Sequence, residues 1–185
     1  MRKIAVLASY NGSGFLAIRE AILHQKLDFE ICVVISNNQE ASVLQKASEF
    51  GIENFVVNDK NFENPNEKIF KILNTFKPDF VLLSGFMKKI DEKIVKNFKI
   101  INCHPSLLPK YGGKGMYGSF VHRAVFENKE KNSGCTIHFV SENYDEGEII
   151  LQKTINIENC KSYVEIEEKV KNLEKIAIVE AFNKL

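Results

Sequence analysis

The segment from Asn102 to Pro105 holds residue types that can carry out chemistry. It reads Asn102-Cys103-His104-Pro105. Asn102 is the last residue of the short run 99–102, which is typical of a β-strand. If the chain stays extended, side-chain alternation places Asn102 and His104 on one side and Cys103 on the other. An amide donor beside an imidazole can stabilise a developing oxyanion and move a proton. We therefore predict that Asn102 and His104 are catalytic and that Cys103 is a packing residue.

The position of His104 supports this prediction. Pro105 restrains the preceding residue to extended geometry, and open α/β folds bind their ligands at the carboxyl ends of strands. The irregular segment 105–119 follows, and a loop of that length in a compact domain is usually functional. The other histidines, His24, His122 and His138, are predicted to be structural, His138 because it alternates along a strand with apolar neighbours.

Asp145 is the acidic candidate, and it lies in the run Asp145-Glu146-Gly147 between two predicted strands. A carboxylate there could orient a nearby imidazole and favour its protonated form. Acidic residues beside glycine are also ordinary in solvated turns. The residues alone leave both interpretations open.

A glycine turn joins the first strand to the first helix and is the candidate phosphate site. Gly12, Ser13 and Gly14 place exposed N–H groups at the positive end of a helix dipole. With Ala17 the turn also satisfies the dinucleotide pattern, but that pattern needs an acid at the end of the second strand, where residues 35–38 read ISNN. A substrate monophosphate is therefore favoured over NAD. The alternatives are a simple strand-to-helix turn, a nicotinamide-dependent oxidoreductase or a non-catalytic nucleotide-binding module.

The composition predicts one globular domain without a strong net field. The 185 residues are 44% hydrophobic, and 25 Lys and Arg against 24 Asp and Glu leave a net charge of +1. That balance gives no global field to recruit nucleic acid or an anionic membrane, and it leaves a local basic patch open. No apolar run reaches membrane-spanning length and none near the N-terminus is long enough for a signal sequence, so we expect a cytoplasmic protein. The four cysteines stand singly, without a Cys-x-x-Cys pair, and we predict no metal site.

The elements that must position these residues alternate between strand and helix patterns. Asn64 and Glu67 form a capping box around Pro65, which marks one helix start. Alternating strands and helices build βαβ units, with a parallel sheet and helices on both faces. The polar loop 141–147 joins the last two strands as a hairpin-like antiparallel element. We predict a single-domain, Rossmann-like α/β fold over residues 1–185, with an open, mostly parallel sheet. The predicted strands are residues 4–8, 29–35, 54–57, 79–83, 99–102, 136–140 and 148–154, and the later helices cover 121–127 and the region after Ser162.

Four segments together resemble the phosphoribosylglycinamide formyltransferase family in order and spacing. They read NGSG at 11–14, LSGFM at 83–87, INCHPSLLPKY at 101–111 and TIHFVSENYDEGEIILQ at 136–152. The resemblance covers nearly the whole chain. Its Asn-x-His-Pro-Ser-Leu-Leu-Pro segment is shared with formyltransferases that act on methionyl-tRNA and on amino sugars. The glycine turn and the short chain favour the ribonucleotide enzymes.

The resemblance implies formyl transfer from 10-formyltetrahydrofolate to the free amine of glycinamide ribonucleotide, a step of purine biosynthesis. The amine attacks the formyl carbon directly, without a covalent enzyme intermediate or a metal. Asn102 and protonated His104 stabilise the tetrahedral oxyanion, and Asp145 keeps the imidazole charged and aids proton transfer. The implied partners are these small molecules, with no nucleic acid and no membrane.

The resemblance also implies two binding regions. For the ribonucleotide it implies the phosphate turn Gly12, Ser13 and Gly14, together with Glu174 on the last helix; for the folate it implies Met87, Lys88, Lys89, Ile90 and Asn102.

Several positions depart from the family pattern. No Arg stands near Asn66, Lys89 replaces an apolar residue, and Gly14 and Lys175 stand where Asn and His are usual. The alternative functions are formyl transfer to an amino sugar nucleotide and nicotinamide-dependent oxidoreduction.

Overall fold

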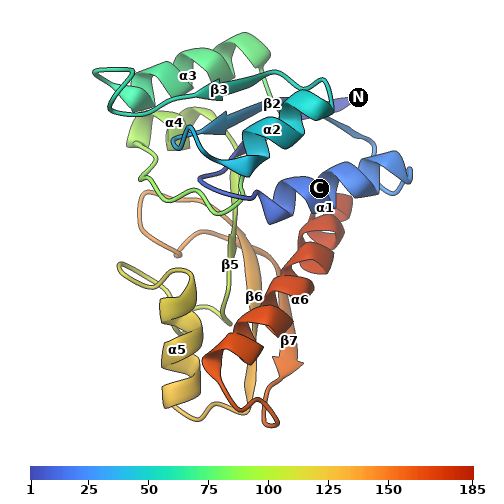
Figure 1. The fold of residues 1–185 in the computed structure, drawn as a ribbon, viewed down its shortest axis with the longest axis vertical. Helices are drawn as coiled ribbons and strands as arrows, with labels where there is room; N and C mark the ends of the chain where they lie inside the picture. The colour runs from blue at the N-terminus through green and yellow to red at the C-terminus, as the bar shows by residue number, and fades with distance from the viewer. The chain divides into compact units, whose positions relative to one another are not determined.

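The computed structural model describes residues 1–185, which form two compact units (Figure 1). The first unit is Met1–Ile101 and the second is Asn102–Leu185, so the boundary falls inside strand β5 (Ile100–His104). The assignment of residues 1–185 to a single domain stays a prediction.

The first unit is built on parallel strands. β1 (Arg2–Leu7) pairs with β2 (Phe29–Ser36) and with β4 (Phe80–Leu83), and β2 pairs with β3 (Asn54–Val56). The resulting order, β3-β2-β1-β4, is that of doubly wound α/β sheets. Ile4 stands opposite residues of both neighbouring strands and is fully buried, as strands covered on both faces require. The helices of this unit are α1 (Ser13–Leu23), α2 (Ser42–Glu49), α3 (Pro65–Phe76) and α4 (Glu92–Asn97).

Helix α3 begins where its capping signal predicts. The Asn64 side chain accepts a hydrogen bond from the Glu67 N–H at 3.0 Å, and Pro65 occupies the first turn. Helix α4 was not predicted, although it has the same kind of start. There the Asp91 carboxylate accepts from the Ile94 N–H at 3.1 Å. A helix of six residues carries too little apolar periodicity to be recognised from the sequence.

The second unit combines the end of β5 with an antiparallel pair and two helices. Strand β6 (Asn132–Phe139) pairs antiparallel with β7 (Ile149–Asn156), with a register shift between Ile137 and His138. Helix α6 (Tyr163–Lys184) packs against both strands and against α5 (Ser119–Glu127). The Ser162 hydroxyl accepts from the Glu165 N–H at 3.3 Å, which confirms the second capping box.

Strand hydrogen bonding follows the order β3-β2-β1-β4-β5-β6-β7. The mostly parallel sheet with its antiparallel element confirms the predicted Rossmann-like α/β class.

Strand β6 starts at Asn132, four residues earlier than the predicted start at residue 136. Ser133 and Gly134 have the composition of a turn, but a Cβ on Gly134 would lie 2.0 Å from the Lys153 carbonyl oxygen, so glycine permits the close approach of β7. No helix in the chain is long and apolar enough to cross a membrane.

Candidate active site

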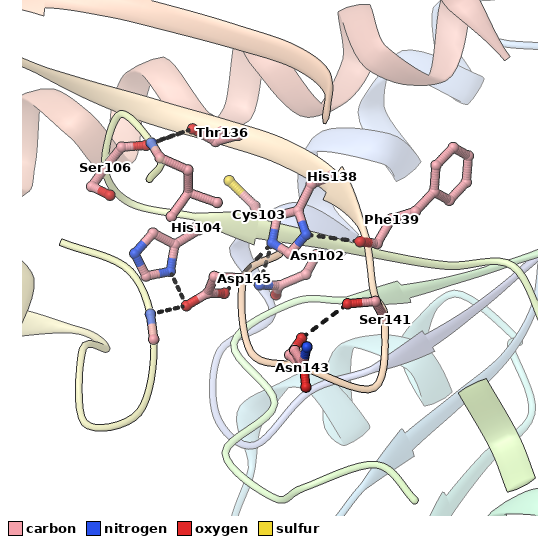
Figure 2. Close-up of polar contacts among 12 residues, drawn as sticks. Asn102, Cys103, His104, Ser106, Thr136, His138, Phe139, Ser141, Asn143 and Asp145 are labelled. Carbon is pink, nitrogen blue, oxygen red and sulfur yellow. Dashed lines mark hydrogen bonds and ion pairs between the residues drawn. The ribbon is translucent and has the colours of Figure 1, made fainter. Parts of the chain in front are cut away.

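Strand β5 presents Asn102 and His104 on the side opposite Cys103. The Asn102 amide reaches His138 on β6, and the His104 ring reaches Asp145 (Figure 2). The Cys103 thiol instead donates to the Glu174 carboxylate of α6 at 3.4 Å. The alternation predicted from the sequence is therefore present, and Cys103 faces the last helix rather than the imidazoles.

The loop between β6 and β7 places Asp145 beside His104. Asp145 has a left-handed backbone conformation, with φ of 58°, which non-glycine residues rarely adopt. A Cβ on Gly147 would lie 1.6 Å from the Phe139 carbonyl oxygen, so the loop closes tightly against the end of β6. The Gly113 N–H donates to Asp145 Oδ2 at 2.8 Å and fixes the carboxylate from another loop.

Both ring nitrogens of His104 face oxygen acceptors. Nε2 lies 2.7 Å from the carbonyl oxygen of Tyr111, and Nδ1 lies 3.5 Å from Asp145 Oδ2. A neutral imidazole can donate at one nitrogen only, whereas the imidazolium donates at both. His104 is 4% exposed, and the Asp145 carboxylate is the kind of partner that a buried imidazolium requires.

His138 is the fourth side chain in this cluster; the sequence predicts a structural role for it and does not predict these contacts. Its Nε2 lies 3.3 Å from Asn102 Nδ2 and 3.6 Å from Asp145 Oδ1. Its Nδ1 lies 2.9 Å from the Phe139 carbonyl oxygen and must carry the proton there, so the neutral ring accepts from Asn102 through Nε2. The predicted strand 136–140 has His138 at its centre, and only the observed end of β6 at Phe139 places His138 near a carboxyl end.

Burial lowers the pKa of His138, while its hydrogen bond to Phe139 and the nearby Asp145 oppose that shift. The charge of His104 lowers the pKa of His138 further. The centre thus contains two imidazoles with different surroundings around one carboxylate. Such an arrangement can keep His138 neutral as an acceptor while His104 serves as a cationic donor.

Thr136 holds the chain that follows His104. Its hydroxyl donates to the Ser106 carbonyl oxygen at 2.7 Å and accepts from the Leu108 N–H at 3.1 Å. Gln152 on β7 donates to the same hydroxyl at 2.9 Å and to the Leu108 carbonyl oxygen at 3.0 Å. Neighbouring strands therefore fix the residues that bring Tyr111 back to His104.

Glu174 on α6 lies against Cys103 of β5. Burial raises its pKa to about 7, although the Cys103 hydrogen bond and Lys171 oppose the shift. A hydrogen bond with Cys135, together with burial and Glu174, raises the pKa of the Cys103 thiol well above its usual value. Cys103 is therefore protonated at neutral pH and is unsuited to nucleophilic attack.

The glycine turn lies in the first unit at the start of α1. Gly12 adopts φ of 59°, and a Cβ there would lie 2.5 Å from a methyl group of Val43. The N–H groups of Gly14 and Phe15 both point at Ser84 Oγ, at 3.0 and 3.4 Å. The structure thus brings the turn to Ser84, whose hydroxyl already accepts from the N–H of Gly14, one of the three residues of the predicted phosphate site.

The predicted folate segment also lies in the first unit. The Met87 N–H donates to Ser9 Oγ at 2.7 Å, and Lys88 forms an ion pair with Asp59 at 3.2 Å. Lys88 and Lys89 border a cavity of about 120 Å³ together with Asn66, while Ile90 is buried. No group of three or more His, Cys, Asp or Glu side chains is arranged to hold a metal ion.

The chain belongs to the formyl transferase family, because the family's sequence model, described as Formyl transferase, matches residues 2–182. Among its relatives is the phosphoribosylglycinamide formyltransferase of Bacillus subtilis (strain 168), which is 33% identical over 179 residues, covering 94% of this chain and 89% of the relative. The chloroplastic enzyme of Vigna unguiculata is 36% identical over 190 residues, covering 100% of this chain and 61% of the relative. The chain thus spans about three fifths of the length of that plant relative.

Solved structures show the same fold. Glycinamide ribonucleotide transformylase 1 from Symbiobacterium toebii superposes with a TM-score of 0.90 at 27% identity, covering 98% of this chain and 86% of the other. Phosphoribosylglycinamide formyltransferase from Anaplasma phagocytophilum gives a TM-score of 0.84 at 33% identity, covering 94% of this chain and 81% of the other.

Proposed function

We propose that this chain transfers the formyl group of 10-formyltetrahydrofolate to the free amine of N1-(5-phospho-D-ribosyl)glycinamide, a step of purine biosynthesis. The observation that carries the proposal is the centre formed by Asn102, His104 and Asp145, in which His104 is paired with a carboxylate beside an amide donor. The names of the relatives and of the solved structures support the choice of substrates.

In the proposed reaction, the substrate amine attacks the formyl carbon and a tetrahedral oxyanion forms. The Asn102 amide has a second N–H beyond the one directed at His138, and it donates to the oxyanion together with protonated His104. The bond from carbon to the folate N10 then breaks. The attacking nitrogen loses one proton and N10 gains one, so the products are the N-formyl ribonucleotide and tetrahydrofolate.

This proposal requires a hydrogen-bond exchange at His104. In the structure Nε2–H is directed at the Tyr111 carbonyl, and Nδ1 faces Asp145. If Nδ1 keeps the carboxylate, Nε2–H must leave Tyr111 to reach the oxyanion. A shift of the 105–111 segment therefore accompanies catalysis in this proposal.

We assign the substrate contacts in two parts. The phosphate is bound at Gly12, Ser13 and Gly14, and Glu174 contacts the ribonucleotide. The folate is bound by Asn102 and by residues 87–90, and the cavity bordered by Lys88 and Lys89 supports that part of the assignment.

The proposed location is the cytoplasm, although two plant relatives are named as chloroplastic enzymes. Cell fractionation tests the proposed location.

A spectroscopic assay tests the proposed function. Purified protein is incubated with 10-formyldihydrofolate or its tetrahydro form and glycinamide ribonucleotide, and deformylation of the folate is followed. Turnover is expected with this acceptor and not with an amino sugar nucleotide. Turnover with the amino sugar alone would replace the proposed acceptor, and tight NAD binding without folate binding would overturn the formyl transfer proposal.

A further inference from the structure

A cavity of about 440 Å³ lies in the second unit and holds none of the four residues of the centre described above. This volume falls within the range of small-molecule sites. Its walls come from the 106–111 segment, Val125 near the end of α5, the connection 129–131 and the first residues of β6. The lining residues are Ser106, Leu107, Lys110, Tyr111, Val125, Lys129, Glu130, Lys131, Asn132 and Ser133.

The charged side chains that line the cavity favour an anionic ligand. Lys110, Lys129 and Lys131 line it with one carboxylate, Glu130. Lys110 is paired with Glu130 at 2.9 Å and Lys131 with Glu158 at 3.4 Å, so the three lysines and two carboxylates leave an excess of one positive charge. Lysine ammonium groups are common partners of phosphate, which carries close to two negative charges at neutral pH.

A buried hydroxyl gives independent support for a ligand. Ser133 lines the cavity and is 2% exposed, yet its Oγ has no hydrogen-bond partner within the protein. A buried hydroxyl without a partner costs about 1–3 kcal/mol, and such groups are rare in native structures. Its Oγ is closed to solvent in this conformation, so a ligand oxygen in the cavity would satisfy it once the Ser133 side chain turns toward the cavity. The apolar side chains of Leu107 and Val125 offer a surface for a carbon skeleton.

The same cavity is connected to His104 through one residue. The Tyr111 hydroxyl donates to Glu130 at 3.0 Å, and the Tyr111 carbonyl oxygen accepts from His104 Nε2 at 2.7 Å. An anion that attracts Lys110 weakens the Lys110–Glu130 pair and changes the partner of the Tyr111 hydroxyl. The backbone of Tyr111 then transmits the change to the imidazole.

We propose that this cavity is a second binding site, built for a small phosphate monoester with an apolar body, and that its occupancy is communicated to His104 through Tyr111. The site is separate from the proposed phosphate turn at residues 12–14, and it does not depend on the identity of the formyl acceptor. Its occupant is an effector rather than a substrate.

Nuclear magnetic resonance of the full chain tests the site, with phenyl phosphate, inorganic phosphate and benzoate as probes at constant ionic strength. Phenyl phosphate is expected to shift the amide signals of residues 106–111 and 129–133 with one dissociation constant. That constant should be at least threefold lower than for inorganic phosphate, because the apolar wall contacts the ring. Equal binding of benzoate would overturn the phosphate assignment. Shifts confined to residues 12–14, or reproduced by sodium chloride, would overturn the site.

Two sets of variants separate binding from communication. The double variant Lys129→Gln/Lys131→Gln is expected to weaken phenyl phosphate at least tenfold and Ser133→Ala about threefold, while Lys60→Gln on the first unit leaves it unchanged. Unchanged affinity in the lysine double variant and in Ser133→Ala would refute the site.

Phenyl phosphate should also shift the His104 ring signals in the unmodified chain, and Tyr111→Phe should remove that shift while binding persists. Immobile His104 signals in the unmodified chain would refute the communication.

Discussion

At the scale of single residues, Asp145 connects the two imidazoles of the proposed centre. One carboxylate oxygen lies 3.5 Å from His104 and the other lies 3.6 Å from His138. The Gly113 N–H holds the same carboxylate from a different loop. In the proposed function, the negative charge of Asp145, more than its hydrogen bonds, is what stabilises a protonated His104 ring.

Substitution of Asp145 separates charge from shape. Asp145→Asn keeps an oxygen acceptor for the Gly113 N–H but loses the charge, so kcat is expected to fall about 10²- to 10⁴-fold. Circular dichroism and the melting temperature should change little. The matched control is Glu146→Gln, an exposed neighbour, which should keep its turnover. Substantial activity in Asp145→Asn would remove Asp145 from its assigned role.

His138 acts in this proposal as a positioning residue for Asn102. In His138→Leu the Asn102 amide loses its acceptor, which at about 1–3 kcal/mol corresponds to a fall of roughly 5- to 150-fold in kcat. His138→Gln offers a side-chain oxygen in its place and should recover much of the loss. Steady-state kinetics of both variants is the measurement. If the two variants lose the same activity, the hydrogen bond to Asn102 is not what His138 contributes.

At the scale of elements, the β6–β7 loop decides where the carboxylate lies. Gly147 has no room for a side chain, since a Cβ would lie 1.6 Å from the Phe139 carbonyl oxygen. The loop also keeps Asp145 in a left-handed conformation, which carries a cost that the surrounding contacts must offset. The packing of this loop, and not its turn composition, places the Asp145 carboxylate beside His104.

Gly147→Ala tests this element. The added methyl group forces the loop away from β6, so we expect a loss of about 2–4 kcal/mol in the free energy of unfolding and a strong loss of turnover. Gly51→Ala is the control, because its Cβ meets open space and only its positive φ opposes the change, at about 1–2 kcal/mol. Urea unfolding compares the two. Equal effects of both substitutions on stability and turnover would contradict the steric argument.

At the scale of the whole molecule, two buried groups make opposite contributions to stability. Burial lowers the pKa of His122 from 6.5 to about 4 and raises that of Glu174 from 4.5 to about 7. The contribution of His122 is complete above pH 6.5 and is lost as the pH falls toward 4. The contribution of Glu174 is complete below pH 4.5 and is lost as the pH rises toward 7. Each contribution amounts to about 3 kcal/mol, so the two nearly cancel between pH 4.5 and 6.5.

Single substitutions should therefore make the contribution of each group to the pH dependence of stability measurable. Relative to the unmodified chain, His122→Gln is expected to lose stability as the pH rises from 4 to 6.5, and Glu174→Gln to gain stability as the pH rises from 4.5 to 7. Urea unfolding across this range measures both, and comparison with the unmodified chain removes the contributions of exposed carboxylates. Parallel profiles for the three proteins would show that neither group titrates as its burial implies.

The sequence by itself determined the α/β class, the start of α3 and of α6, and the placement of Asn102 and His104 on one side of a strand end. These features depend on residues within a few positions of one another: caps at Asn64 and Ser162, side-chain alternation, and apolar runs. Local spacing therefore contained the physical cause. The family resemblance, rather than spacing, joined Asp145 to the other two residues.

Only the tertiary structure decided what each of those residues touches. His138 reaches Asn102 across 36 positions, Gly113 reaches Asp145 across 32, and Cys103 reaches Glu174 across 71. The role of Tyr111 follows from its backbone carbonyl, which every residue type possesses. Contacts of this kind arise when strands and loops pack together, and no local pattern in the sequence records which partner a buried polar group will find.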